Sequence, residues 1–367
     1  MELNFALSST PMPPKGGLPL MDRRTLAYIG ERGLYGALVG LVYGLVNLYG
    51  EPSLIFLCGV IGFLIGFFST LLDRWLFNTR LRRQQFIVVF SVRSVAYLAV
   101  VSLSILIPLG VYTSLVTQTS PWHLMESPIL RGWMTKGGFA YLVVYSLVVL
   151  LVIQFITLVS RLLGPNVLIN YMLGRYHSPK EEERIFMFMD LRSSTTIAER
   201  LGHLKWHQFL NDFFYDIAKP VRRSRGEIYQ YVGDEVVISW PKKTGLKNLN
   251  CIHCFFGIWD RMEVRRDYYM QKYGYEPVFK AGYHVGVVIV GEIGDYKRDI
   301  VFHGDTVNTA SRIQMECNHY NRRLLLSNTL LNQLDLGNEY TSEYITKIVL
   351  RGKAEELELY SLDPVEG

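Results

Sequence analysis

The fold of the second half of this chain is decided by the stretch Tyr229-Gln230-Tyr231-Val232-Gly233-Asp234-Glu235-Val236-Val237-Ile238-Ser239-Trp240. Two apolar runs, rich in β-branched and aromatic residues, flank a Gly-Asp pair. The pattern predicts a β-hairpin, because Gly supplies the backbone angles of a tight turn. The turn places the Asp234 carboxylate at the hairpin tip. An isolated Asp in such a turn is usually only a turn former, so a function for Asp234 depends on its companions.

A second carboxylate lies upstream of the hairpin, at Asp190. The run Arg184–Met189 predicts a buried strand that ends at this residue. A helical pattern follows, and Ser and Thr residues before it are good helix N-caps. A carboxylate beside free helix N–H groups suits a metal-bound polyphosphate. Asp190 and Asp234, from neighbouring strands, are therefore candidates to hold two divalent cations over one triphosphate.

Two further motifs carry polar side chains. Asn308 and Arg312 lie four residues apart at the start of a predicted helix, so they share one helix face. Asn can bond a sugar oxygen, and Arg suits spread phosphate charge. Lys353 lies in a predicted turn between two late strands and offers a mobile cation. Strands mixed with helices predict an α+β domain.

The remaining elements of this half follow from hydrophobic patterning. We expect a solvated charge run at Lys180–Glu183, a helix at Trp206–Val221 interrupted at Pro220, a helix at Asn248–Tyr273, a strand at Phe279–Val290, a strand at Leu324–Ser327 and late strands at Tyr344–Leu350 and Glu358–Leu362. Cys251 and Cys254 have C-x-x-C spacing within the second helix, but no second pair follows at a zinc-site distance, so we do not expect metal or redox use.

The first half of the chain is strongly apolar. Each of four segments reaches the roughly 20 apolar residues that a membrane-spanning helix needs. They are Ala27–Leu48, Ser53–Leu72, Phe86–Val116 and Phe139–Ser160. We therefore predict a four-helix membrane domain over 25–160, preceded by a tail at 1–24 and followed by a linker at 161–183 and a second domain at 184–367.

Orientation follows from the Lys and Arg residues of the loops. They concentrate before the first segment, between the second and third, and after the fourth, so both termini are predicted on the cytoplasmic side. Four cysteines do not make a disulfide framework, which fits that side. No secretory signal is evident at the start of the chain. The formal net charge of +5 is mild, and we expect a lipid bilayer but no nucleic acid as a partner.

Three details of the membrane half carry expectations. Arg93 lies inside a long apolar segment, and we expect it at the inner interface, where a long side chain reaches the polar region. Gly59, Gly62 and Gly66 suit close helix approach and thereby dimerisation. Gly164-Pro165 breaks the helix that leaves the membrane, and a short amphipathic helix, Asn166–Leu173, is expected after it.

With these motifs in place, the region from about Arg184 to Leu362 resembles the catalytic domain of class III nucleotidyl cyclases. The resemblance covers about half the chain and includes four motifs in order. They are Phe188-Met189-Asp190-Leu191 with Ser194 and Thr195, Val232-Gly233-Asp234, Gly304-Asp305-Thr306-Val307-Asn308 through Arg312, and Arg351-Gly352-Lys353. The membrane half resembles the multi-pass bacterial members, which implies a plasma (bacterial inner) membrane location with the catalytic domain in the cytoplasm.

The resemblance implies a ferredoxin-like βαββαβ core and a defined reaction. Asp190 and Asp234, helped by the Leu191 carbonyl, would bind two Mg²⁺ or Mn²⁺ ions. The 3′-hydroxyl of a nucleoside triphosphate would attack its α-phosphate, and pyrophosphate would leave. Asn308 would orient the ribose and Arg312 would stabilise the transition state. In this class the two Asp and the Asn/Arg pair of one site come from different protomers, which implies a homodimer.

The positions that select the base depart from the usual patterns. Adenylate cyclases commonly carry Lys, and guanylate cyclases Glu, where this chain has Gln230. Adenylate cyclases often carry Asp or Thr where it has Val301, with Asp299 two residues earlier on the same strand face and His303 two residues later. Gln presents either a donor or an acceptor, so it does not choose a base. ATP is the favoured substrate, followed by GTP, with a pyrimidine triphosphate as a third alternative.

Two other functions compete with a membrane-bound adenylate cyclase. The departures at Gln230 and Val301 leave open a non-catalytic receptor, although degenerate domains usually lose a metal Asp or the Asn/Arg pair, and this chain keeps both. A transport function has less support, because the four segments show no acidic pair or broken-helix pattern. The stimulus sensed by the membrane half is not readable from the sequence.

Overall fold

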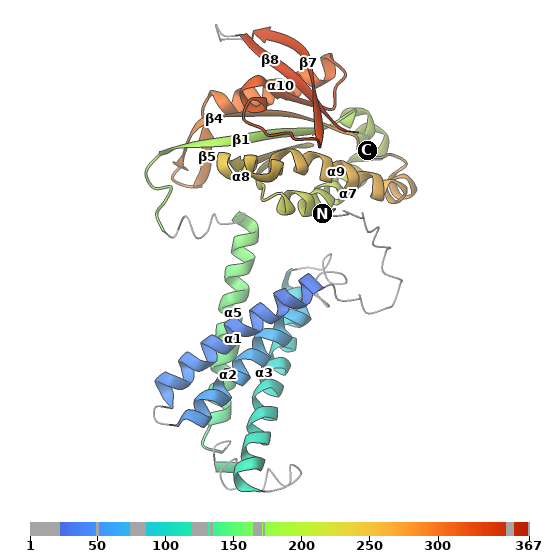
Figure 1. Ribbon diagram of the computed structural model, residues 1–367. Coiled ribbons are helices and arrows are strands. Elements are labelled where there is room, and N and C mark those ends of the chain that lie inside the picture. Colours follow the sequence, from blue (N-terminus) through green and yellow to red (C-terminus); the bar gives the residue numbers. More distant parts are fainter. Residues whose placement is uncertain are drawn as a thin grey trace. The chain divides into compact units, whose positions relative to one another are not determined.

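The computed structural model describes residues 23–48, 51–73, 86–118, 131–132, 135–163, 171, 173–349 and 356–365 (Figure 1). The chain divides into two compact units, Met1–Thr157 and Leu158–Gly367. Most of the predicted helix Asn166–Leu173 lies outside the described residues, as does Lys353. Each unit is described by itself below.

The first unit is helical. Its helices are α1 (Arg23–Asn47), α2 (Pro52–Leu72), α3 (Phe86–Thr117) and the first part of α5 (Gly138–Leu163). Three described stretches are long and apolar enough to cross a membrane: Pro52–Leu72, Val88–Thr117 and Gly138–Thr157, with mean hydropathies of 2.4, 2.2 and 2.5. These three agree with the second, third and fourth predicted segments. Helix α1 has a suitable length but is less apolar, and it contains Glu31 and Arg32.

Glycines hold α1 and α2 in very close contact. A Cβ atom added to Gly36 would lie 2.2 Å from the carbonyl oxygen of Gly62, and one added to Gly66 would lie 2.5 Å from that of Arg32. A Cβ on Gly59 would meet the Leu41 side chain at 2.9 Å. The predicted close approach is therefore correct, but the assignment of these glycines to dimerisation is wrong. They are used within one chain, because α1 occupies the surface that they offer.

Arg93 has a carboxylate partner that the sequence did not reveal. Its guanidinium lies 3.1 Å from Asp73, the residue that directly follows α2, and the Tyr97 hydroxyl donates a hydrogen bond of 2.7 Å to the same carboxylate. The charge is thus neutralised between the end of α2 and the first third of α3. This pairing lowers the cost of keeping an Arg within an apolar helix.

The second unit is built on one mixed sheet. Six elements form its central part: β1 (Lys180–Leu191), α7 (Ser194–Arg223), β2 (Glu227–Val232), β3 (Glu235–Pro241), α9 (Asn250–Tyr273) and β4 (Phe279–Ile293). The strands lie in the order β2-β3-β1-β4, and β1 is antiparallel to both of its neighbours. This is the ferredoxin-like βαββαβ arrangement that the resemblance implied.

The chain then extends the sheet beyond β4. The later elements are β5 (Asp299–His303), α10 (Asp305–His319), β6 (Leu324–Ser327), α11 (Asn328–Leu331), β7 (Tyr340–Val349) and β8 (Glu356–Pro364). Strand β6 joins β4 in parallel, β8 and β7 follow it, and β5 pairs with the far end of β4. The short helix α8 (Lys242–Leu246) follows β3.

The sheet has a helical layer on each face (Figure 1). Met187 and Met189 of β1 point into a large core with α7 and α9, and Phe186 and Phe188 point to the opposite face, where Ala310 of α10 covers them. This alternation follows from the two-residue period of a strand. A strand that is buried on both faces explains the continuous apolar run 185–189.

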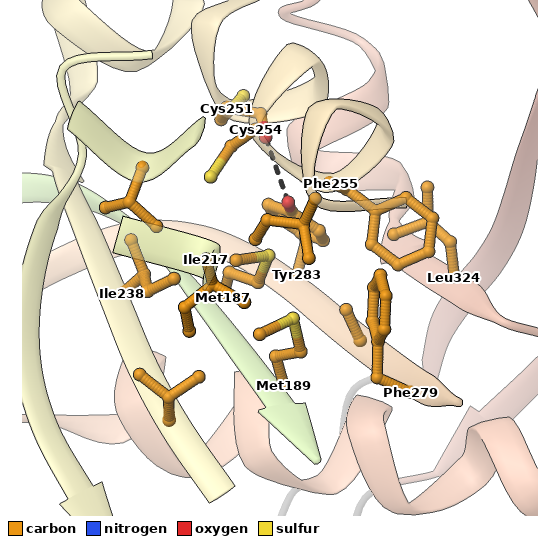
Figure 2. Packing of buried hydrophobic residues seen from close by; sticks show 14 of the residues in the cluster. Met187, Met189, Ile217, Ile238, Cys251, Cys254, Phe255, Phe279, Tyr283 and Leu324 are labelled. Atoms are coloured by element: carbon orange, nitrogen blue, oxygen red, sulfur yellow. Dashed lines mark hydrogen bonds between the residues drawn. The ribbon is translucent and has the colours of Figure 1, made fainter. Parts of the chain in front are cut away.

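The larger core contains the two cysteines of the C-x-x-C spacing. Figure 2 shows Cys251 and Cys254 beside Tyr283, whose hydroxyl donates a 2.9 Å hydrogen bond to the Cys251 carbonyl. Both thiols are fully buried, and burial raises the pKa of each to about 12. Protonated, enclosed thiols are poor nucleophiles and poor metal ligands, so these two side chains contribute to packing.

Several predicted boundaries were wrong. Lys180–Glu183 belongs to β1 and pairs with Val287–Val290 of β4. Pro220 lies inside α7 and does not interrupt it, while the real break is at Gly202, where φ is 73°. Strand β4 continues to Ile293, and the turn comes at Gly294. In each case sheet pairing or helix packing outweighed the local preference of charged residues, Pro or Gly.

Candidate active site

The predicted hairpin forms as β2 and β3, and Gly233 begins its turn. Gly233 has φ of 63°, a value that favours glycine, and Asp234 directly follows it at the tip. Val232 pairs with Glu235 across the turn, and the register shifts between Ile228 and Gln230. Strand β3 pairs with β1 up to Val236 and Met189, so the hairpin tip lies beside the end of β1 and Asp234 approaches Asp190.

Asp190 lies near the end of β1 on the face that α10 covers. Its Oδ2 lies 3.3 Å from the Lys280 ammonium and accepts a 3.1 Å hydrogen bond from the Gln314 amide. Lys280 is the direct neighbour of Asp190 on β4, and only 6% of it is exposed. Gln314 comes from α10 and is 3% exposed. Two buried groups from separate elements therefore fix one oxygen of this carboxylate.

The carboxyl groups at this end of the sheet raise one another's pKa values. Burial, then the hydrogen bond and charge of Asp234, raise the pKa of Asp190, and Lys280 acts in the opposite direction. Burial and the charges of Asp190 and Asp234 raise the pKa of Glu235 to about 7. One lysine thus does not compensate three neighbouring carboxyl groups. The site favours additional positive charge.

The donor set fits a hard divalent cation. Carboxylate oxygens are the ligands that Mg²⁺ and Mn²⁺ prefer, and Mg²⁺ is often bound by one or two carboxylates together with water and substrate phosphates. Among the described residues, no three His, Cys, Asp or Glu side chains form a complete metal-ligand set. Asp190 and Asp234 therefore suit open coordination, in which a phosphate-bearing ligand supplies the missing oxygens.

The loop after Asp190 leads directly into α7. Leu191 is buried, and Arg192 donates its backbone N–H to the Val278 carbonyl at 2.7 Å. Ser193 is the N-cap residue with φ of 56°, and its side chain accepts no hydrogen bond from the first turn. Ser194 and Thr195 form that first turn. The backbone N–H groups at the start of α7 are thus not capped by Ser193, as a phosphate-binding helix start requires.

The predicted pair on α10 lies on a different face from Gln314. Asn308 is exposed and Arg312 is half-buried, whereas Gln314 points inward at Asp190. Two residues along a helix turn the side chain by about 200°, so Arg312 and Gln314 face opposite ways. The structure thus brings Asp190 and Asp234 together and directs Arg312 to the side of α10 opposite the group that bonds Asp190.

The predicted base-selecting residues are divided between β2 and β5. Gln230 is exposed and follows the bulge of β2. Val301 and Asp299 lie on the same face of β5, where they pair with Gly291 and Ile293 of β4. Asp299 also forms an exposed 2.7 Å ion pair with Lys297. The two strands meet at Tyr229, whose ring packs edge-on against Phe302 at 5.0 Å.

Sequence reasoning missed Lys280, Gln314 and Glu235. A signal existed for Lys280, because it is a single cation within the otherwise apolar run Phe279-Lys280-Ala281 at a strand start. Glu235 adjoins Asp234 and was counted only as part of the hairpin. Gln314 gave no signal, because its partner is 124 positions away in the chain.

Comparison with known proteins now assigns the class. Residues 177–364 match the family described as the adenylate and guanylate cyclase catalytic domain, and the chain belongs to this family. It is 37% identical over 219 residues to adenylate cyclase 2 of Rhizobium meliloti (strain 1021), covering 60% of each protein. It is 26% identical over 179 residues to an adenylate cyclase of Anabaena cylindrica, covering 48% of this chain and 36% of that protein. The chain thus spans 60% or less of these relatives' lengths.

A solved structure supports the fold. A bacterial light-regulated adenylyl cyclase superposes with a TM-score of 0.51 at 20% identity, covering 60% of this chain and 64% of that one. At this identity the similarity concerns the fold alone. The recognition of a class III nucleotidyl cyclase from its motifs is confirmed by the family match.

Proposed function

We propose that this protein is a membrane-bound adenylate cyclase that converts ATP to 3′,5′-cyclic AMP and pyrophosphate. One observation carries the proposal. The ends of two neighbouring strands bring Asp190 and Asp234 together at the start of α7, with too little positive charge to balance them. Membership of the cyclase family indicates that this geometry serves the cyclisation of a nucleoside triphosphate. The similarity to adenylate cyclase 2 favours ATP as the substrate.

Asp190 and Asp234, with the Leu191 carbonyl, are the residues that would hold two Mg²⁺ or Mn²⁺ ions. When bound, such ions lower the pKa of a hydroxyl group and neutralise phosphate charge. Lys280 and Gln314 keep the Asp190 side chain in one orientation. The start of α7, with Ser194 and Thr195, supplies donors to phosphate oxygens, and Lys353 supplies a further cation to the triphosphate.

Asn308 and Arg312 complete the site from the partner protomer in a homodimer. Both lie on a face of α10 that turns away from the carboxylates of their own chain, which supports a role across a dimer interface. Asn308 would orient the ribose, and Arg312 would stabilise charge on the α-phosphate in the transition state. Preorganised charge of this kind is the largest contribution in many enzymes.

Residues of β2 and β5 would contact the base of the nucleotide. Gln230 would read the base edge with its amide, and Asp299 would supply an acceptor because Val301 supplies none. The contact between Tyr229 and Phe302 ties β2 to β5, so these residues belong to one region of the surface. An acceptor at Asp299 suits the exocyclic amine of adenine.

The membrane half anchors the enzyme. The proposed organisation has a tail at 1–24, four spans within 25–160 with α1 as the first, a linker at 161–183 and the catalytic domain at 184–367 on the cytoplasmic side of the bacterial inner membrane. Three helices apolar enough to span a bilayer support this, and the tight α1–α2 contact supports the inclusion of α1.

Purified full-length protein in detergent, assayed with ATP and Mn²⁺, tests the proposal. We expect cyclic AMP from the unchanged protein and at least about a 10³-fold lower rate from Asp234→Ala, with the same circular dichroism spectrum. Substitution of Asp267, an exposed α9 carboxylate, by Ala is the matched control and leaves the rate unchanged. Equal rates for Asp234→Ala and the unchanged protein would remove Asp234 from the chemistry.

A further inference from the structure

The second unit contains a cavity of about 320 Å³ between α9 and the ends of β6 and β8. None of the carboxylates Asp190, Asp234 and Glu235 lines it. Cavities that bind small molecules begin at about 300 Å³. The wall that α9 contributes is aromatic and consists of Phe255, Phe256 and Trp259. Size and lining therefore suit a small ligand that contains a ring.

One hydroxyl group faces this cavity. Ser361 of β8 lines the cavity and is 4% exposed, and its side chain makes no hydrogen bond within the described part of the chain. The hydroxyl is therefore available to a polar atom of a ligand.

Two side chains of opposite charge, Arg323 and Asp363, line the rim of this cavity. The Arg323 guanidinium stacks on the Trp259 ring, 4.0 Å from its centroid, and Asp363 lies at the end of β8. In the residues that the structure describes, neither forms an ion pair with the other or with a third side chain. The third charged lining residue, Arg322, is already paired with Glu343 at 2.5 Å. A guanidinium suits a carboxylate, and a carboxylate suits an ammonium group.

We propose that this cavity binds a small aromatic zwitterion of the free amino acid class. The carboxylate of the ligand pairs with Arg323, its ammonium group pairs with Asp363, and its ring packs on Phe255 and Phe256. Ser361 supplies a hydrogen bond at the base of the cavity. A ligand with one charge only would leave one rim residue unpaired, so the two charges together select the zwitterion.

The cavity is connected to the active site through one turn. Arg192 donates hydrogen bonds to the Asn321 side chain at 3.3 Å and to the Arg322 carbonyl at 2.7 Å. The Ala281 N–H donates to the Arg323 carbonyl at 2.8 Å. Arg192 follows Leu191, and Ala281 follows Lys280, so the turn that lines the cavity supports both sides of the carboxylate site. We expect occupancy to change the turnover of ATP, and this regulatory half rests on the proposed function, whereas binding does not.

Isothermal titration of the full-length protein in detergent tests the binding. The probes are L-phenylalanine, phenylacetate, which lacks the ammonium group, and phenethylamine, which lacks the carboxylate. We expect Asp363→Asn to weaken L-phenylalanine about fivefold or more and to leave phenylacetate unchanged. Arg323→Gln should weaken L-phenylalanine and phenylacetate but spare phenethylamine. Arg266→Gln, at an α9 arginine that pairs with Glu276, is the control and should match the unchanged protein.

Absence of L-phenylalanine binding, or equal binding by both rim variants and the unchanged protein, would overturn the site. Turnover of ATP is then measured with and without saturating L-phenylalanine. A rate that changes in the unchanged protein, with the half-effect concentration of L-phenylalanine raised in Asp363→Asn by the same factor as its Kd, supports the regulatory half, and a constant rate overturns it. A protein that binds L-phenylalanine but makes no cyclic nucleotide would refute the proposed function and leave the site standing.

Discussion

At the scale of single residues, Gln314 is the group whose role the structure defines and the sequence concealed. Its amide holds Asp190 Oδ2 from α10, the helix that also carries Asn308 and Arg312. One helix therefore carries a group that positions a carboxylate of its own protomer and, under the proposed function, two groups that serve the partner's site. Groups that orient metal-binding side chains commonly change metal affinity by 10–100-fold when removed.

Gln314→Met keeps the length of the side chain and removes the hydrogen bond. We expect Mn²⁺ affinity to fall about tenfold because Asp190 loses its orientation, with the melting temperature nearly unchanged. Electron paramagnetic resonance titration of free Mn²⁺ measures this without reference to activity. Met315→Leu, at an exposed neighbour, is the control. Unchanged Mn²⁺ affinity in Gln314→Met would reduce Gln314 to a packing residue.

At the residue scale, the proximity of Asp190 and Asp234 could be predicted from the sequence. Each stands at the end of a predicted strand, and the structure brings the two carboxylates together. Their role as metal ligands stays a prediction. Lys280 and Gln314 were missed because their importance lies in contacts across the sheet. The unusual position of Arg93 in an apolar helix was recognised, but its partner Asp73 was not. The two residues lie at different helices, and the sequence does not show which residues of neighbouring helices meet.

At the scale of elements, α7 and α9 are joined by a buried polar network. Asp212 of α7 accepts hydrogen bonds from Tyr268 at 2.6 Å, Lys272 at 2.6 Å and Tyr273 at 2.7 Å. Burial raises the pKa of Asp212, but these hydrogen bonds and the Lys272 charge outweigh it, so the net pKa is lowered. The ionised form is therefore the one that stabilises the packing of α7 on α9.

Asp212→Asn should lower the stability of the second unit by about 2 kcal/mol at pH 7, because Lys272 loses its charged partner. A carboxyl group with a lowered folded-state pKa stabilises above its ordinary value of 3.8, and this contribution is lost as the pH falls through the folded-state pKa. The gap in melting temperature between the two proteins should thus close below about pH 4. Asp267→Asn is the exposed control, and a gap that persists at low pH would contradict the assignment.

The glycine contact between α1 and α2 gives a second prediction for elements. Gly62→Val should separate the helices, because even a Cβ atom would lie 2.2 Å from the Gly36 carbonyl oxygen. We expect a melting temperature several degrees lower in detergent, about 4 °C or more. Gly30→Val is the matched control, since no atom lies within 4 Å of a Cβ at Gly30. Equal melting of the two variants would show that the contact contributes little.

Elements were predicted well where a hydrophobic period was long and unbroken, as in the hairpin and α9. Their ends were not, because Lys180–Glu183 became strand through pairing with β4 and Pro220 was accommodated inside a packed helix. The role of Gly59, Gly62 and Gly66 was misjudged because the helix that contacts them, α1, belongs to the same chain. A small-residue stripe predicts close approach, but it does not say which helix approaches.

At the scale of the whole molecule, the proposed active site is made from two copies of the chain. Asp234→Ala and Arg312→Ala damage different halves of a site, so each variant alone should be inactive. Co-expressed, half of the dimers are mixed, and each mixed dimer regains one of two sites. Purification through two different tags isolates the mixed dimers, for which we expect about half of the full rate, against about a quarter before that selection. An inactive mixture would contradict a site shared between protomers.

The central claim is the reaction itself, and product identification tests it most directly. The purified full-length protein is incubated with Mn²⁺ and, separately, with ATP, GTP, CTP and UTP, and the products are identified by mass spectrometry. We predict 3′,5′-cyclic AMP and pyrophosphate from ATP at a higher rate than any other cyclic nucleotide, and none from Asp234→Ala. A preferred product other than cyclic AMP would contradict the assigned substrate, and the absence of a cyclic product from all four would contradict the proposed function.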